Sequence, residues 1–194
     1  MIVYLHGFAS TGQSTKVVDL RIRFGGENVV APDLPFDPHE VLKVVNNIVT
    51  TFYKNRQPNE KLVFVGTSLG AFYANFFGHV YDCPAVLVNP SANPSKSLMN
   101  KLGPNINYMS GEEFMVSMAH LDKLDMMRKH VQENYSGSLV HLFAAKDDEV
   151  IPYEAMLENF KYTSHLCVME DGGHRFTKHW GLVVDHIEKI MSNS

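Results

Sequence analysis

The 194-residue sequence lacks the features of membrane proteins, nucleic-acid-binding proteins and disulfide-rich scaffolds. No apolar run approaches the length of a membrane span, and the apolar start Met1–Leu5 has no basic leader, so we expect neither membrane insertion nor a signal peptide. The formal net charge of -4 provides no basic field for nucleic acid. The chain has only two cysteines, Cys83 and Cys167, which we expect to be reduced, buried thiols. These absences favour a cytoplasmic protein.

What the chain does contain is enough apolar sequence for the core of one domain, residues 1–194, because 45% of its residues are hydrophobic. Strands are expected at residues 2–5, 28–31, 61–65, 85–88, 139–144 and 165–169. Helices are expected at residues 14–24, 38–55, 71–77, 153–160 and 176–191. Continuous apolar strands that alternate with helices predict an α/β fold, in which both faces of a parallel sheet are covered.

One stretch, from about residue 90 to 119, breaks this alternation. Turn-forming Pro, Gly, Asn and Ser residues are mixed there with Leu, Met, Tyr and Phe. A loop this long inside a compact domain is usually functional. Methionine and aromatic side chains adapt to variable apolar ligands, so we expect a cap-like insertion over an acyl pocket. The alternative is an irregular excursion that only packs on the body of the protein.

The segment Gly66-Thr67-Ser68-Leu69-Gly70 carries the strongest functional signal. It follows an apolar run of strand formers and precedes a segment that is typical of a buried helix. A Gly-x-Ser-x-Gly sequence between a strand and a helix is a nucleophile elbow, which holds the serine hydroxyl clear of the sheet. The pattern therefore predicts a catalytic Ser68, and the alternative is a glycine-rich structural turn with a solvated serine.

A serine needs a base to accept its proton and an acid to orient that base. In the elbow arrangement the acid and then the base follow the serine along the chain, each after a late strand. Three carboxylates, Asp147, Asp148 and Glu149, follow the strand at 139–144 and compete for the role of the acid. His174 follows the last strand, after two glycines that permit a tight loop, and is the candidate base. The other histidines show no zinc-binding spacing, so we expect no metal.

An oxyanion hole is expected from two backbone amides. One is the N–H of Leu69, the residue after the nucleophile. The other is the N–H of Phe8, in the segment His6-Gly7-Phe8 that directly follows the first strand. His6 would then brace this loop and take no part in proton transfer.

Five motifs together resemble the α/β-hydrolase superfamily, and more narrowly the small bacterial YqiA/YcfP-type esterases. The motifs are His6-Gly7-Phe8, Pro32-Asp33-Leu34-Pro35, Gly66-Thr67-Ser68-Leu69-Gly70, Asp148-Glu149-Val150-Ile151-Pro152 and Gly173-His174-Arg175-Phe176. The narrower similarity also includes Leu5-His6-Gly7-Phe8-Ala9-Ser10 and Val88-Asn89-Pro90. The resemblance covers nearly the whole chain.

The resemblance implies a Ser68–Asp148–His174 triad that hydrolyses carboxylic esters or acyl thioesters without a cofactor. It selects Asp148 because the superfamily's acid usually sits four residues before a proline, here Pro152. It also implies a three-layer α/β-hydrolase fold with about six mostly parallel strands, reduced because the two leading strands are missing. The sheet edge exposed by their loss could be covered in a homodimer.

The sequence thus predicts a serine hydrolase that acts on a small acyl ester or thioester. Two alternatives stay open. The same triad could serve an acyltransferase, and the fold could belong to a non-catalytic binding protein.

Overall fold

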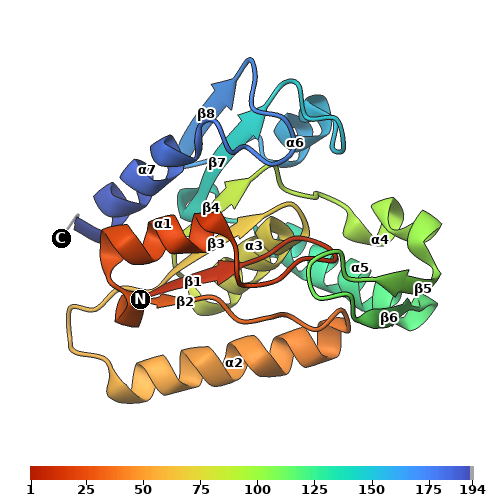
Figure 1. The fold of residues 1–194 in the computed structure, drawn as a ribbon. Helices are drawn as coiled ribbons and strands as arrows, with labels where there is room; N and C mark the ends of the chain where they lie inside the picture. Colours follow the sequence, from red (N-terminus) through yellow and green to blue (C-terminus); the bar gives the residue numbers. More distant parts are fainter. Residues whose placement is uncertain (193–194) are drawn as a thin grey trace.

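Six parallel strands form the central sheet, in the order β2-β1-β3-β4-β7-β8 (Figure 1). The computed structural model describes residues 1–192. The strands of the sheet are β1 (Ile2–Leu5), β2 (Val29–Val30), β3 (Val63–Thr67), β4 (Ala85–Val88), β7 (Val140–Ala145) and β8 (His165–Met169). The parallel sheet predicted from the sequence is confirmed. The strand expected at 28–31 is shorter, because as an edge strand it pairs only with Ile2 and Val3.

The register of the central strands brings their carboxyl ends to one edge of the sheet. Leu5 at the end of β1 lies opposite Gly66 in β3, and Thr67 at the end of β3 lies opposite Val88 in β4. Strands β1 and β4 are buried along their whole length, which explains their continuous apolar sequence. The loops that follow these strands are therefore neighbours in space.

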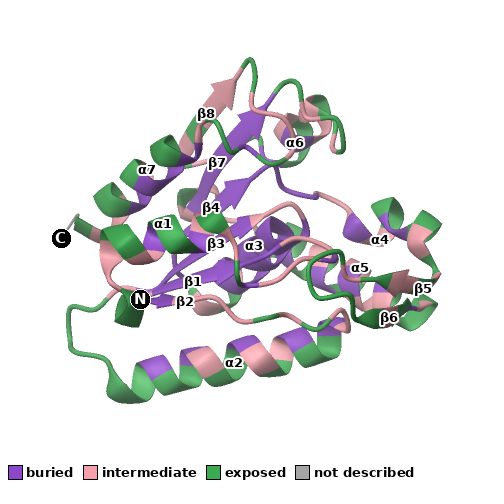
Figure 2. Ribbon diagram, viewed as in Figure 1, coloured by how far each residue is buried: buried purple, intermediate pink, exposed green. Residues whose placement is uncertain are grey.

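Helices cover both faces of the sheet and complete the expected three-layer fold (Figure 1). The helices are α1 (Thr15–Phe24), α2 (Pro38–Asn55), α3 (Leu69–Tyr81), α4 (Pro94–Ser97), α5 (Met118–Glu133), α6 (Tyr153–Asn159) and α7 (Trp180–Ser192), with short 3-10 helices η1 (Gly26–Asn28), η2 (Met99–Lys101) and η3 (Gly137–Leu139). Side chains of α1 and α7 form one apolar cluster with the sheet, and side chains of α2, α3 and α5 form the other. Figure 2 shows the buried strands between these layers and a buried stripe along the inner side of α2.

The last helix starts later than the sequence pattern predicts. It begins at Trp180, whereas the apolar pattern predicts a start at Phe176. Phe176 is fully buried and has a left-handed backbone with φ 52°, so the chain makes a turn at this point. Helix α2, in contrast, is confirmed over 38–55, since Asp37 caps it and Pro38 occupies its first turn.

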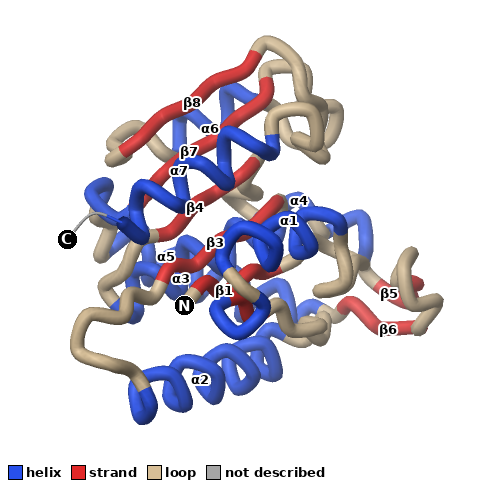
Figure 3. Tube along the Cα trace, turned by 60° about the vertical axis from the view of Figure 1, so that its left-hand side comes forward, coloured by secondary structure: helices blue, strands red, loops and turns tan. Residues whose placement is uncertain are grey.

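The insertion at 90–119 contains regular structure that the sequence did not predict. Strands β5 (Gly103–Ile106) and β6 (Glu113–Val116) form an antiparallel hairpin, preceded by α4 and η2. Figures 1 and 3 both show this hairpin projecting beyond the carboxyl end of β1. Its turn is tied to the loop after β1, because Tyr108 N donates to Ala9 O (3.2 Å) and Asn107 Nδ2 donates to Ser10 O (2.8 Å).

Two further observations concern the composition of the chain. Both cysteines are free; Cys83 is buried as expected, but Cys167 on β8 is only partly buried. Within residues 1–192, no helix has the combined length and apolar character needed to cross a bilayer.

Candidate active site

The elbow at Ser68 has the strained backbone that its sequence predicts. Ser68 joins β3 to α3 with φ 57° and ψ -121°, a combination rare for a residue with a side chain. A side chain on Gly66 would collide with the carbonyl oxygen of Gly70, and one on Gly70 would collide with the carbonyl oxygen of Leu5. The two glycines are therefore required by the close packing of α3 on β3 and β1.

Backbone hydrogen bonds hold this conformation from the neighbouring strand. Ser68 N donates to Val88 O (3.0 Å), and Ser91 N donates to Ser68 O (3.2 Å). The serine is thus fixed at the end of β4 as well as at the end of β3.

The loop after β8 brings His174 against Asp148. His174 Nδ1 lies 2.9 Å from Asp148 Oδ2 and 3.0 Å from Oδ1. The Asp148 side chain is fully buried, and its Oδ1 also accepts the amides of Val150 and Ile151 at 2.8 Å each. The carboxylate is therefore fixed, and its contact with Nδ1 leaves Nε2 of His174 as the free ring nitrogen.

The two neighbouring carboxylates bind backbone groups of the same loop. Asp147 accepts the amides of Gly172 (3.2 Å) and Gly173 (2.8 Å). Glu149 accepts the amide of His174 (2.8 Å). Of the three acids that compete in the sequence, only Asp148 contacts the imidazole.

Ser68 and His174 line one cleft of ≈ 750 Å³. Within residues 1–192, no hydrogen bond joins Ser68 Oγ to the imidazole. Hydrogen bonds between catalytic groups are often long or poorly aligned without substrate and tighten in the complex. The elbow and the histidine loop therefore bring the candidate nucleophile and the candidate base to the same cleft.

The two expected oxyanion donors also face this cleft. Phe8 and Leu69 line it beside Ser68, and neither backbone amide donates a hydrogen bond to another described residue. His6 Nε2 accepts the amide of Leu34 at 2.8 Å, so its Nδ1–H is free to donate to Gly7 O at 2.9 Å. Burial lowers the pKa of His6, which keeps the ring neutral in this bracing role.

Asn89 is a site residue to which the sequence analysis gave no role. Its side chain is fully buried at the end of β4, and its amide nitrogen donates to Gly173 O (3.0 Å) and His174 O (3.1 Å). Its amide oxygen accepts Ala145 N at 2.9 Å. Asn89 thus connects β4, β7 and the histidine loop. The only signal was its place in the Val88-Asn89-Pro90 motif, directly after a strand.

Part of the cleft wall comes from the insertion at 90–119. The sequence alone could not show which residues of this insertion face the pocket. Pro94, Leu98, Tyr108 and Met109 line its wall. Within residues 1–192, no group of three or more His, Cys, Asp or Glu side chains is placed to hold a metal ion.

A family model described as "Uncharacterised protein family (UPF0227)" matches residues 1–192. The chain belongs to this family. A UPF0227 protein of Shewanella sediminis is 23% identical over 98% of this chain and 97% of its own length. A UPF0227 protein of Vibrio campbellii is 30% identical over 53% of this chain and 57% of its own length.

Solved structures similar to this UPF0227 protein have the α/β-hydrolase fold predicted from its motifs. Est1E from Butyrivibrio proteoclasticus has a TM-score of 0.71 at 15% identity and covers 98% of this chain and 86% of its own. A monoacylglycerol lipase from Paleococcus ferrophilus has a TM-score of 0.69 at 17% identity and covers 100% of this chain and 94% of its own. The α/β-hydrolase fold is thus confirmed.

Proposed function

We propose that this protein is a serine hydrolase that cleaves carboxylic esters or acyl thioesters through an acyl-enzyme intermediate. The observation that carries the proposal is the contact of buried Asp148 with His174 Nδ1, which leaves Nε2 unpaired within residues 1–192, on a histidine that lines the same cleft as Ser68. The strained φ of Ser68 supports it, because such strain persists at functional sites and a binding turn has no need of it.

In the proposed mechanism, Ser68 attacks the acyl carbonyl while His174 Nε2 takes its proton. The Leu69 and Phe8 amides stabilise the oxyanion of the tetrahedral intermediate. His174 then returns the proton to the departing alcohol or thiol. Water, activated by the same imidazole, releases the acid, while Asp148 holds the Nδ1–H tautomer and stabilises the imidazolium.

The names of several structural relatives support a hydrolase. They include an esterase, a monoacylglycerol lipase and lipolytic enzymes. An acyltransferase on the same triad is the first alternative, distinguished by acyl transfer to an added alcohol in preference to water. A non-catalytic binding protein is the second.

A fluorophosphonate probe tests the nucleophile directly. We expect covalent labelling of the wild-type protein and of Ser97→Ala, which removes another serine of the same cleft. We expect no labelling of Ser68→Ala, and a kcat for p-nitrophenyl butanoate lower by roughly 10³–10⁶-fold. Equal labelling of Ser68→Ala would reject the proposal.

The cytoplasmic location and the homodimer expected from the sequence stay predictions. The two free thiols fit a reducing compartment. The two-residue β2 leaves room for only a short pairing between copies at that edge of the sheet. Size-exclusion chromatography with light scattering would show a single 21.9 kDa particle if the dimer does not form.

A further inference from the structure

The charged side chains that line the cleft beside Ser68 are all basic. Besides His174, they are Lys16, Lys101 and Arg175, and no Asp or Glu of residues 1–192 lines it. The chain as a whole has the opposite balance, with 21 acidic residues and 17 basic ones. A net acidic protein thus has a cationic cleft at its candidate active site.

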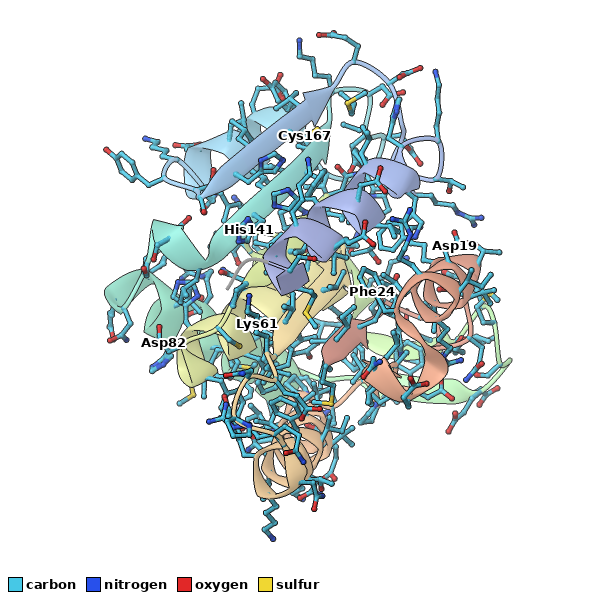
Figure 4. All side chains as sticks on the ribbon, turned by 90° about the vertical axis from the view of Figure 1, so that its left-hand side faces the viewer. Asp19, Phe24, Lys61, Asp82, His141 and Cys167 are labelled. Atoms are coloured by element: carbon cyan, nitrogen blue, oxygen red, sulfur yellow. The ribbon has the colours of Figure 1, made fainter. Side chains whose placement is uncertain are left out.

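Lys16 and Arg175 lie close enough for their charges to interact. Lys16 is the second residue of α1, is half-buried, and has its Nζ 5.6 Å from the centre of the Trp180 ring. Burial lowers the pKa of Lys16 and the charge of Arg175 lowers it further, while Asp19 on the outer part of α1 opposes both (Figure 4). Two like charges held together in this way favour an anion between them.

No carboxylate of residues 1–192 forms an ion pair with Lys16, Lys101 or Arg175. Other cations at this side of the fold do have partners: Lys146 pairs with Glu170, and Lys178 pairs with Asp171. The three cations that line the cleft are thus left without a carboxylate partner in the described part of the chain.

The first turn of α1 adds to the positive electrostatic potential of the cleft. Residues 13–16 line the cleft, and the first turn contains no acidic residue. The amides at the start of a helix carry a partial positive charge, which normally attracts an acidic side chain. Here Lys16 occupies that turn, so the helix end increases the positive potential.

We propose that this cationic cleft recognises a carboxylate or phosphate group on the substrate, held between Lys16 and Arg175, while Lys101 adds positive charge to the same cleft. The proposal rests on the hydrolase function and narrows its substrates to anionic acyl esters or thioesters. Arg175 directly follows His174 in the chain and both line the cleft, so an anion at the guanidinium lies in the same cleft as the base. Binding there would position the scissile carbonyl, and therefore act on kcat as well as on KM.

Paired substrates test this recognition and identify the anion. The carboxylate arm compares p-nitrophenyl hemisuccinate with p-nitrophenyl butanoate. The phosphate arm compares the butanoyl ester of 2-phosphoethanol with ethyl butanoate. In the arm that matches the natural substrate, we expect kcat/KM for the anionic ester to exceed that for the neutral one by about tenfold or more.

The variants Lys16→Met and Arg175→Gln should each reduce this anionic-to-neutral ratio about tenfold, because each removes a charged hydrogen-bond donor. Lys16→Arg should restore the ratio. Lys54→Gln removes an exposed cation on α2, outside the cleft, and should leave the ratio as in the wild type. Thermal melts should show that Lys16→Met is at least as stable as the wild type, since it relieves repulsion and keeps an apolar stem over Trp180.

Anion binding to the Ser68→Ala variant tests the anion site independently of the hydrolase function. Calorimetric titration with monoethyl succinate and with ethyl phosphate should detect binding of one of them, and Lys16→Met in the same background should weaken that binding about tenfold. Anion binding without any ester hydrolysis would reject the hydrolase and support the anion site. Hydrolysis of neutral esters, with no anionic preference in either arm, would overturn the anion site and leave the hydrolase in place.

Discussion

Three consecutive acidic residues have three different partners at this site. Asp148 contacts the imidazole of His174, while Asp147 and Glu149 accept backbone amides of residues 172–174. Composition alone could not assign them, because the turn after β7 determines where each side chain points. Because the three carboxylates have separate partners, mutating each one should affect activity differently.

We expect Asp148→Asn to lower kcat by about 10⁴-fold with little change in folding, because an amide can stabilise the wrong tautomer of His174. Asp147→Asn is the control, since it removes the neighbouring charge, keeps an acceptor for one of the two amides of Gly172 and Gly173, and does not face the ring. Its kcat should stay much closer to wild type. Ester turnover by both variants checks this, and equal losses would contradict the assignment of Asp148.

The residues of the elbow were predictable, and the cationic pair was not. Gly66, Ser68 and Gly70 lie within five consecutive residues, and steric conflict requires the two glycines. Lys16 and Arg175 lie at opposite ends of the chain, on α1 and in the loop before α7. Only the fold brings their charges together.

At the scale of elements, the site depends on Asn89 joining the ends of two strands to the histidine loop. Its side chain makes three hydrogen bonds, to Ala145, Gly173 and His174. Its backbone is left-handed, with φ 45°, a conformation that asparagine tolerates better than most residues.

We expect Asn89→Gly to reduce the free energy of unfolding by about 1–3 kcal/mol, since it leaves polar groups of the site unpaired. Asn89→Ala should cost about 1 kcal/mol more, because alanine resists the left-handed conformation that glycine adopts freely. Urea unfolding of both variants measures the side-chain and backbone effects separately. Stabilities equal to wild type would show that Asn89 does not support the loop.

The strands of the central sheet could be predicted from apolar runs in the sequence, but the hairpin β5–β6 could not. Its residues alternate between partly buried and exposed positions, so no continuous apolar run marks them. Pro104 lies within β5, where proline normally argues against a strand. An antiparallel hairpin tolerates it, because the hairpin has only two strands and both are edges.

At the scale of the whole molecule, a group of three histidines couples stability to pH. His141 lies on β7 beneath α7 (Figure 4), with its Nδ1 2.9 Å from Nε2 of His186. The ring of His165 on β8 stacks on His186 at 3.9 Å. Burial, and then the charge of His165, lowers the pKa of His141 to about 4. Burial, followed by His165, His141 and Lys189, lowers the pKa of His186 to about 4 as well.

Because these rings stay neutral in the folded protein while the unfolded chain binds protons below its pKa of about 6.5, stability falls as the pH drops from about 6.5 toward 4. Urea unfolding at several pH values across this window should show the decrease. His186→Gln should flatten it, whereas His39→Gln, which changes an exposed histidine on α2, should not. An unchanged slope in His186→Gln would show that the cluster does not control it.

The hairpin turn is attached by hydrogen bonds to Ala9 and Ser10, in the same loop as the proposed oxyanion donor. Ala9 is the residue next to Phe8, whose amide is the proposed second donor to the oxyanion. If the hairpin swung outward, it would pull on this peptide and spoil the alignment of the donor. Evolution could therefore enlarge the entrance for bulkier acyl groups more readily by shortening side chains such as Tyr108 and Met109 than by loosening the backbone that carries them.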